Sequence, residues 1–525
     1  MRVLRIYWAG RSVGTFSEEE PGISLQYDAE WISSGGYPIS LSLPVQTEPL
    51  RSPAVAWFIG NLLPEGPARE SLNAQYKLDS TDDFGLLERL GAECAGALSI
   101  LPLGELPPSD DAPFDQLYEP AMDAYELGQL IQAFATSPTL AFKGHRLRLS
   151  LAGVQRKFTV ARFEGAIHRS FGGATTHIVK PDIDLVRGER PKYPGMVFNE
   201  YFCLRLASAC GLDAATVELL PYVLYRDGTP QYAYMTQRCD RRVLHPGRVE
   251  RLHQEDFCQA LGLDRARKYE QDTRGVTLAD LFAFLRDARH VSAPAVAQRQ
   301  LLNGVLFNTL IGNGDAHAKN YALLRNGDEL RVAPLYDLLC TQAYPDVNNF
   351  FAQRLGHATR FADLEWDDLK RLEQALGIRL RAVLAALRQL AAQLLKQLPL
   401  LRDQMAREPY WGEAADIVQR ICGIAAARAV ELLRLIDAER ATQGADGSPF
   451  QPGPFHELSV TVWADSPQCK QRQGRLRRLL ADNGGLLHVV DRDREFPELT
   501  LEQIVQLEAA FESEVRRDAA LLKAR

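Results

Sequence analysis

The stretch 311–321, Ile-Gly-Asn-Gly-Asp-Ala-His-Ala-Lys-Asn-Tyr, constrains this chain more than any other. Asp315 is followed five residues later by Asn320, and Asp337 comes 22 positions after Asp315, beyond two short runs around the turn 326–327. An acidic residue, an amide at that spacing and a second acidic residue after a strand-turn-strand are the groups that phosphoryl transfer needs on one side of ATP. The spacing therefore favours a phosphotransferase site.

The same stretch has a structural alternative, because Gly-Asn-Gly-Asp is also good loop chemistry. In that alternative, His317 and Lys319 are solvated loop residues. The trio occurs together with an upstream lysine on a predicted strand, and this combination favours the kinase interpretation.

Two upstream segments supply groups that could face the phosphates of ATP. Residues 147–160 place a small-residue turn at Gly153 between two alternating runs, so that backbone N–H groups can approach a phosphate and Lys157 can add charge. The next predicted strand, 175–181, carries Lys180 near its end, where it can act as a point charge. Taken singly, these are an ordinary turn and a strand-end lysine that reaches for water.

A helix is predicted over 198–207, with Gly211 as the glycine that follows its end. Glu200, near its first turn, is a candidate partner for Lys180 in the strand-lysine to helix-glutamate pairing of kinases. The helix dipole alone favours an acid at this place equally well.

The order of elements resembles that of a protein kinase. Strands at 217–225 and 231–236 run into 237–239, and a long, mostly helical remainder follows. The predicted fold class is α+β, a two-lobed protein-kinase-like fold. Its β-rich N-lobe occupies 124–238, its helical C-lobe occupies 239–442, and 237–239 form the hinge.

Three further parts are predicted outside the lobes. Residues 1–105 alternate as a small antiparallel sheet, with a strand at 40–44 and a helix capped at 82–83, and form a structural or docking subdomain. Residues 106–123, rich in proline and acid, are predicted to be a linker. Residues 455–525 form a small α/β appendage, whose basic stretch 470–478 is more typical of a solvated helix face than of a nucleic-acid contact.

Composition limits the compartment and the partners. At 525 residues the chain should divide into roughly three or four domains, and its net charge of −7 gives no chain-wide footprint for nucleic acid or an anionic membrane. Eight cysteines without a Cys-x-x-Cys pair are typical of buried thiols in a reducing compartment. No apolar run reaches the roughly 18 residues of a membrane span, so we expect a cytoplasmic protein.

Motifs of unusual composition follow one another along residues 1 to about 440. In the kinase part they lie at 150–157, 176–180, 239–241, 255–259, 268–270, 314–320 and 334–337, and in the first subdomain at 41–44, 63–66, 84–87 and 94–97. In this order they resemble the HipA family of bacterial serine/threonine kinase toxins.

The resemblance implies the toxin of a type II toxin–antitoxin pair, which uses ATP and Mg²⁺ to phosphorylate a protein of the translation machinery, typically an aminoacyl-tRNA synthetase. It also implies a DNA-binding, HipB-like antitoxin, through which the chain would contact DNA. By the match, Asp315 is the catalytic base, Asn320 and Asp337 are metal ligands, and Lys180 binds phosphate. The remaining ATP-binding residues that it implies are Ala152, Gly153, Val154, Gln155, Arg156, Lys157, Gln237, Arg238, Cys239, His317, Ala318, Lys319 and Tyr336.

In the family, the serine at the position of Ser150 is autophosphorylated, which expels the phosphate loop and silences the kinase. A group carrying about two negative charges beside that loop would compete with the phosphates of ATP. Two residues depart from the family pattern: Cys239 replaces a common aromatic residue and Gln237 a common acid.

Two alternatives stay open, a small-molecule kinase on the same fold and a non-catalytic co-repressor that acts with the antitoxin. The second would not require Lys180, Asp315, Asn320 and Asp337 all to be present.

Overall fold

The structure is a computed structural model that describes residues 1–443 except 21, 110–111, 137–156, 183–185, 187, 189–190, 225–229, 272–273, 288 and 348. Internal contacts divide the chain into the unit Met1–Ala438 and the unit Glu439–Arg525. Nearly all of the second unit lies outside the described residues, and with it the predicted appendage and its basic stretch.

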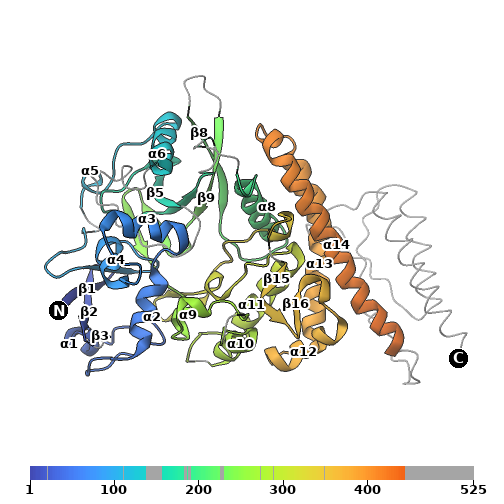
Figure 1. Ribbon diagram of the computed structural model, residues 1–525, viewed down its shortest axis with the longest axis horizontal. Coiled ribbons are helices and arrows are strands. Elements are labelled where there is room, and N and C mark those ends of the chain that lie inside the picture. Colours follow the sequence, from blue (N-terminus) through green and yellow to red (C-terminus); the bar gives the residue numbers. More distant parts are fainter. Residues whose placement is uncertain are drawn as a thin grey trace, which may run out of the picture. The chain divides into compact units, whose positions relative to one another are not determined.

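The first subdomain is a four-stranded antiparallel sheet in the order β3-β2-β1-β4, accompanied by four helices (Figure 1). Its strands are β1 (Arg2–Trp8), β2 (Arg11–Glu19), β3 (Gly22–Tyr27) and β4 (Leu98–Pro102). Its helices are α1 (Ala29–Ser33), α2 (Pro53–Leu62), α3 (Gly66–Tyr76) and α4 (Asp83–Leu90). The apolar strand positions close a core with Phe58 of α2 and Phe84 of α4, so the small sheet predicted from alternation is present.

In this subdomain one prediction from the sequence is confirmed and one is wrong, and hydrogen bonds of the segments concerned explain both. Asp82 caps α4 by accepting a 2.8 Å hydrogen bond from the backbone N–H of Gly85, as predicted. The strand predicted at 40–44 is wrong, because this segment consists of bends and turns. The Ser40 hydroxyl and the Leu41 N–H instead donate to the carboxylate of Glu255, which replaces the partner strand.

The segment predicted as a linker is partly packed against the N-lobe. It contains the short helix α5 (Phe114–Leu117), and Leu117 and Tyr118 are buried beside Phe163 and Ala174. The Tyr118 hydroxyl donates a 3.0 Å hydrogen bond to the carbonyl of Ala174. Leu117 and Tyr118 thus join the segment to a hydrophobic cluster of the N-lobe despite its proline and acid content.

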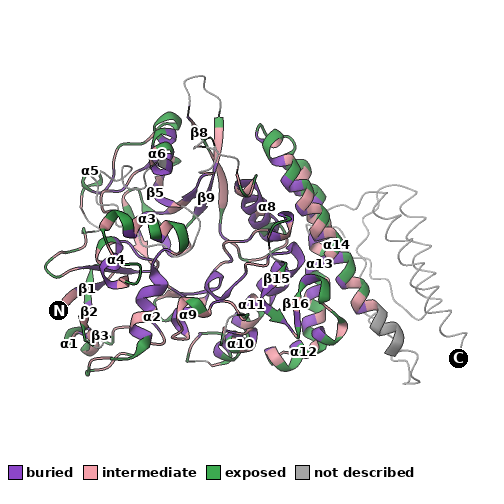
Figure 2. Cartoon of the chain, in the orientation of Figure 1, coloured by how far each residue is buried: buried purple, intermediate pink, exposed green. Residues whose placement is uncertain are grey.

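The N-lobe is a five-stranded antiparallel sheet in the order β6-β5-β7-β9-β8. The strands are β5 (Phe158–Phe163), β6 (Ala166–His168), β7 (His177–Lys180), β8 (Val217–Val223) and β9 (Pro230–Gln237). Helix α6 (Ala124–Thr136) packs its apolar face on this sheet through Leu127 and Ile131. Helix α8 (Met196–Ala209) contacts β8 and β9 and is buried along most of its length (Figure 2).

The C-lobe is built around α11 (Pro294–Ile311), whose residues from Leu301 onward are almost all buried. The other helices are α9 (Phe257–Ala260), α10 (Leu278–Arg286), α12 (Trp366–Leu376), α13 (Leu380–Met405) and α14 (Trp411–Gln443), with short 3-10 turns η2 (Arg265–Arg267), η3 (Ala318–Asn320), η4 (Thr341–Ala343) and η5 (Phe361–Asp363).

Strands are more frequent in the C-lobe than the sequence suggested. They are β10 (Arg241–His245), β11 (Arg248–Arg251), β12 (His253–Asp256), β13 (Ala322–Asn326), β14 (Glu329–Val332), β15 (Phe350–Leu355) and β16 (Ala358–Arg360). The predicted strand-turn-strand after Asn320 is the hairpin β13-β14. Strand β12 pairs with β13 and completes a three-stranded sheet.

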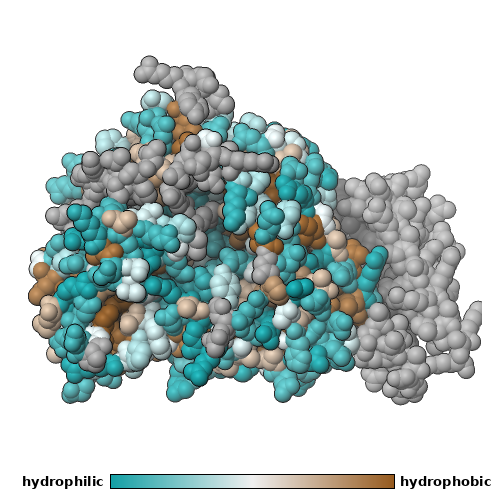
Figure 3. Space-filling view, in the orientation of Figure 1, coloured by the Kyte–Doolittle hydropathy of each residue, from teal (hydrophilic) through white to brown (hydrophobic). Residues whose placement is uncertain are grey.

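On the face shown in Figure 3, hydrophilic residues dominate the described surface and apolar patches are small and scattered. Most of the largest fully buried aromatic side chains lie in two main clusters, which match the first subdomain and the C-lobe. Within the part of the chain that the structure describes, no helix is long and apolar enough to cross a membrane.

Candidate active site

Lys180 lies at the end of β7, the central strand of the N-lobe sheet, and its side chain is buried. Its ammonium nitrogen Nζ is 2.5 Å from Oε1 of Glu200 on α8 and 2.7 Å from Oδ1 of Asp337. Burial alone would lower the pKa of Lys180, but the carboxylates of Asp337 and Glu200 outweigh it and raise the pKa. The predicted pairing of Lys180 with Glu200 is therefore present, and Asp337 joins it.

Electrostatics at this cluster favour an ionised Asp337. Burial opposes ionisation, yet the ammonium groups of Lys180 and Lys157 hold the pKa of Asp337 well below its usual range. Burial raises the pKa of Glu200. Lys157, directly before β5, is near enough that burial and the Lys180 charge lower its pKa to about 8. The positive charges of both lysines thus act on Asp337, while Lys180 is also paired with Glu200.

The loop that carries Asp315 is fixed by its own polar residues. Helix α11 ends at Ile311 and is followed by Gly312, whose φ of +72° turns the chain out of the helix. The Asn313 carbonyl oxygen Oδ1 accepts the N–H of Asp315 at 3.0 Å, and the Gly314 N–H donates to the Thr341 hydroxyl at 2.8 Å. The glycines and asparagine of the sequence motif therefore set the backbone of a rigid loop.

Asn320, five residues after Asp315, lies against it. Its amide nitrogen donates a 2.8 Å hydrogen bond to the backbone carbonyl of Asp315, so the amide oxygen is not used in this contact. Asp337 is close enough that its charge raises the pKa of Asp315, adding to the larger effect of burial. The structure therefore brings Asp315, Asn320 and Asp337 into one site.

Tyr269 is a member of this site that sequence reasoning did not assign. Its hydroxyl donates a 2.5 Å hydrogen bond to Oδ1 of Asp315, and its ring meets His317 edge-on with ring centroids 5.0 Å apart. The signal was the motif 268–270, which marked a resemblance without revealing that its tyrosine reaches Asp315.

His317 and Lys319 are buried, so the alternative that made them solvated loop residues is wrong. Burial lowers the pKa of His317 to about 3, and its ring nitrogen Nδ1 has no hydrogen-bond partner among the described residues. Lys319 directs its ammonium group at Asn61 of the first subdomain, with 2.8 Å to Oδ1, and at Oδ2 of Asp256, also at 2.8 Å. Its charge is committed to the protein, so any nucleotide contact at this position would use the backbone.

Ala318 and Tyr336 make further hydrogen bonds that hold this loop in place. Ala318 is fully buried, and its N–H donates to the carbonyl of Lys268 at 3.2 Å. The Tyr336 hydroxyl donates to the carbonyl of Lys319 at 2.8 Å, and burial raises its pKa well above the ordinary value. Tyr336 thereby ties the residue before Asp337 to the loop that carries Asn320.

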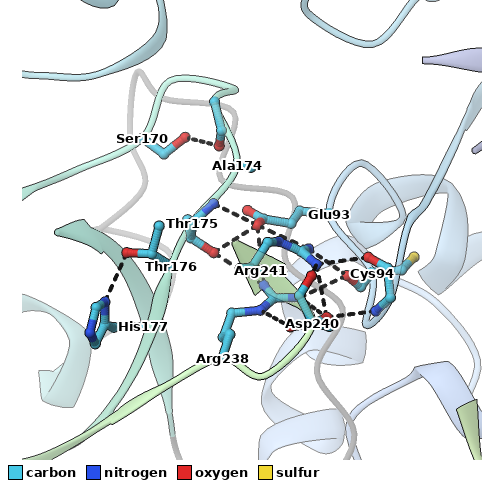
Figure 4. Close-up of polar contacts among 12 residues, drawn as sticks. Glu93, Cys94, Ser170, Ala174, Thr175, Thr176, His177, Arg238, Asp240 and Arg241 are labelled. Carbon is cyan, nitrogen blue, oxygen red and sulfur yellow. Dashed lines mark hydrogen bonds and ion pairs between the residues drawn. The ribbon is translucent and has the colours of Figure 1, made fainter. Parts of the chain in front are cut away.

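The predicted hinge is held by a buried ionic network that Figure 4 shows. Arg238 donates to Oε1 of Glu93 at 3.1 Å and to Oδ2 of Asp240 at 2.8 Å, and Arg241 also reaches Oδ2 of Asp240 at 2.8 Å. The backbone N–H of Thr175 donates to the same Glu93 oxygen at 2.8 Å. The Arg238 side chain is committed to this network, which leaves only its backbone for a nucleotide.

Gly96 of the first subdomain is part of the same contact. Its N–H donates to Oδ2 of Asp240 at 2.7 Å, its carbonyl accepts from Arg241 at 2.8 Å, and its φ is +75°. A Cβ atom here would lie 2.6 Å from the backbone nitrogen of Gln254, so only glycine fits. The glycine of the motif 94–97 therefore allows the backbone of this loop to approach the hinge closely.

The other hinge positions are less constrained. The Gln237 N–H donates to the carbonyl of Thr216 at 2.9 Å and its side chain is exposed, whereas the Cys239 thiol donates to Oε1 of Gln254 at 3.1 Å. Ser150 and the predicted phosphate-loop residues Ala152, Gly153, Val154, Gln155 and Arg156 lie outside the described residues.

The side-chain oxygens of Asn320 and Asp337 suit the partial ligand set of a magnesium ion and do not form a metal site made of protein ligands alone. Among the described residues there is no group of three or more His, Cys, Asp or Glu side chains that could hold a metal. Mg²⁺ is typically bound by one or two protein oxygens together with substrate phosphates and waters. An ionised Asp337 and one amide oxygen supply that kind of partial ligand set.

Comparison with known proteins shows the family that this chain belongs to. Residues 4–101 match the model of the HipA N-terminal domain and residues 149–398 match that of the HipA-like C-terminal domain. A Sinorhizobium fredii protein named "Putative kinase Y4mE" is 37% identical over 386 residues, which cover 73% of this chain and 88% of that protein. The serine/threonine-protein kinase toxin HipA of Shewanella oneidensis is 31% identical over 359 residues, which cover 66% of this chain and 75% of the toxin.

A solved structure supports the predicted fold class. The complex of Shewanella oneidensis HipA with HipB and operator DNA contains a chain that superposes with a TM-score of 0.69 and 26% identity, covering 83% of this chain and 99% of that one. The two-lobed, kinase-like α+β fold with its additional N-terminal subdomain is thereby confirmed.

Proposed function

This chain belongs to the HipA family, and from that premise we propose that it is an ATP- and Mg²⁺-dependent serine/threonine protein kinase that acts as the toxin of a toxin–antitoxin pair. The observation that carries the proposal is the assembly of Lys180, Asp315, Asn320 and Asp337 in one site. These are the lysine, base, amide and acid of the kinase template.

In this proposal Asp315 accepts the proton that a substrate hydroxyl releases as its oxygen bonds to the γ-phosphorus and ADP departs. Lys180, held by Glu200, neutralises phosphate charge, and the oxygens of Asn320 and Asp337 hold the metal ion. When bound, Mg²⁺ supplies positive charge that stabilises the phosphates during transfer.

The nucleotide contacts follow the predicted positions. Residues 152–157 cradle the phosphates, with Lys157 adding charge, and the backbone of 237–239 meets the adenine. His317, Ala318 and Tyr336 border the nucleotide. The neutral imidazole that burial imposes on His317 suits a position beside a purine ring better than one that pairs with phosphate.

The substrate and the partners are the finer part of the proposal. We assign as substrate a protein of the translation machinery, an aminoacyl-tRNA synthetase, which places the protein in the cytoplasm, and we assign Ser150 as the site of autophosphorylation. A HipB-like antitoxin would hold the kinase in check, which is supported by the similarity to a HipA chain solved with HipB and operator DNA.

Incubation with radiolabelled Mg·ATP tests the enzyme. The wild-type protein should incorporate phosphate on Ser150, and Asp315→Asn should reduce the rate by about a hundredfold or more, because general-base catalysis contributes at least that much. Asp363→Asn, at an exposed residue of η5, is the matched control and should keep full activity.

Mass spectrometry would locate the phosphate, and expression in a bacterial host would test toxicity. Growth arrest that Asp315→Asn relieves supports the toxin assignment. Absence of both nucleotide binding and phosphate incorporation in the wild-type protein would contradict the kinase, and equal toxicity of the two proteins would contradict its role as the toxin.

A further inference from the structure

In the described part of the chain, a donor holds the carboxylate of Asp315 through one of its two oxygens. Among the described residues, Tyr269 is the one whose side chain makes a hydrogen bond to it, at 2.5 Å to Oδ1. Oδ2 accepts no side-chain hydrogen bond from these residues. A carboxylate with one oxygen fixed by a donor keeps a single rotamer and directs its second oxygen consistently, whereas an unbonded one rotates about its side-chain torsions.

Tyr269 sits on a segment that several backbone contacts fix to the rest of the C-lobe. The carbonyl of Lys268 accepts the Ala318 N–H at 3.2 Å and the Gln353 side chain at 2.8 Å. The Glu270 N–H donates to the carbonyl of Ala352 at 2.9 Å. These bonds connect the segment both to the loop that follows Asp315 and to β15, so the tyrosine cannot move independently of its target.

An ion pair from the first subdomain also fixes this segment. Glu65, the residue directly before α3, forms a 2.6 Å ion pair with the ammonium group of Lys268, and the two side chains are only 14% and 10% exposed. An ion pair with so little solvent around it is costly to break from one side. The motif 63–66 therefore anchors the residue that precedes Tyr269.

We propose that Tyr269 is a positioning residue for the catalytic base, fixing Asp315 through Oδ1 so that Oδ2 receives the substrate hydroxyl, and that the Glu65–Lys268 ion pair holds Tyr269 in place. This inference rests on the proposed kinase function and deepens it. It makes the first subdomain a structural component of catalysis, because its Glu65 acts on the base through two successive residues.

Tyr269→Phe tests the hydroxyl while it keeps the ring against His317. We expect kcat to fall about tenfold or more, the size of effect produced by misorienting a catalytic group, while the KM for ATP and the affinity for a non-hydrolysable Mg·nucleotide stay within about twofold. Tyr37→Phe is the matched control. It removes a 2.6 Å bond from a tyrosine hydroxyl to the exposed Asp328 and should change neither constant.

A crystal structure of Tyr269→Phe gives a readout that does not depend on activity. Asp315 should occupy more than one rotamer in the variant and one in the wild-type protein. A single, unchanged Asp315 rotamer, or an unchanged kcat in an active wild-type background, overturns the positioning role and leaves the kinase proposal intact. Phosphate found on Tyr269 itself also overturns it, since the tyrosine would then be an acceptor.

Glu65→Gln and its combination with Tyr269→Phe test whether the Glu65–Lys268 ion pair holds Tyr269 in place. If Glu65 acts through Tyr269, Glu65→Gln should lower kcat and should add little in the double variant. Independent, multiplicative losses would overturn this part of the inference. A wild-type protein that neither binds nucleotide nor transfers phosphate would overturn the proposed function, and the positioning role with it.

Discussion

At the scale of single residues, Asp337 combines a chemical requirement with a backbone requirement. Its φ is +57°, in the left-handed region that most residues avoid, and its carboxylate bonds to the buried ammonium group of Lys180. Aspartate and asparagine tolerate this backbone conformation better than other residues with a Cβ atom. The conformation turns the side chain toward Lys180 directly after Tyr336.

A pair of substitutions separates the two requirements of Asp337. Asp337→Asn keeps the backbone preference and an acceptor for Lys180, but it removes the buried negative charge that Lys180 and Lys157 stabilise, so it should be less stable than the wild-type protein. Asp337→Ala should be less stable than Asp337→Asn by about 1 kcal/mol or more, because alanine pays the left-handed strain without local compensation. Both should lose phosphate transfer. Urea unfolding measures the difference, and equal stabilities of the two variants would contradict the backbone argument.

At the scale of elements, the loop between α4 and β4 is fitted to the hinge after β9. Burial alone would raise the pKa of Glu93, but the guanidinium groups of Arg238 and Arg241 offset it and lower the pKa. The charge of Arg251 acts on Glu93 in the same direction. With Asp240 as the second carboxylate, three guanidinium groups interact with two acids. The positive charges of the network therefore outnumber its negative charges.

Glu93→Ala should therefore be strongly destabilising. Removing one acid leaves buried guanidinium groups uncompensated, and breaking a buried pair in this way costs about 3 to 5 kcal/mol. The pair Arg242–Glu250, with side chains 47% and 40% exposed, is the matched control on the neighbouring hairpin. Glu250→Ala should cost less than about 1 kcal/mol. Denaturant unfolding of both variants tests the contrast, which similar losses would refute.

At the scale of the whole unit 1–438, the first subdomain is bound to the kinase lobes by buried polar contacts from three of its loops and from helix α2. They join Ser40 and Leu41 to Glu255, Asn61 to Lys319, Glu65 to Lys268, and Glu93 to Arg238. Each leaves a buried polar or charged group without a partner if the subdomain separates. We therefore expect the subdomain and the lobes to unfold together.

This junction should also make stability depend on pH through Glu255. Burial raises the pKa of Glu255 from 4.5 to about 7, so the folded protein holds a proton that the unfolded chain releases. The stability from this proton is present in full below pH 4.5 and is lost as the pH rises through about 7. The difference between the two pKa values corresponds to about 3 kcal/mol.

Glu255→Gln should abolish this dependence, because a glutamine stays neutral and can still accept the N–H of Leu41. The stability of the variant relative to the wild-type protein should rise by about 2 to 3 kcal/mol between pH 5 and pH 8, as the wild-type carboxyl loses its proton. Unfolding free energies across this range give the measurement. A pH-independent difference between the two proteins would show that Glu255 does not titrate at the junction.

The sequence by itself identified the residues that we propose for phosphoryl transfer, because most of their spacing is local. Asp315 and Asn320 share one loop, Asp337 follows one hairpin, and Lys180 ends a strand whose apolar pattern is readable. The same local logic predicted the small antiparallel sheet, the cap at Asp82 and the two lobes. Each depends on neighbours within about one supersecondary unit, which a single sequence contains.

Only the tertiary structure decided which side chains serve the site and which hold it together. Arg238 and Lys319 were predicted to contact ATP, yet their charges bind Glu93 and Asn61, and Tyr269 was not assigned although it reaches Asp315. These pairs join residues 46 to 258 positions apart. Whether such residues meet depends on how the sheets and helices pack, and no local pattern encodes it.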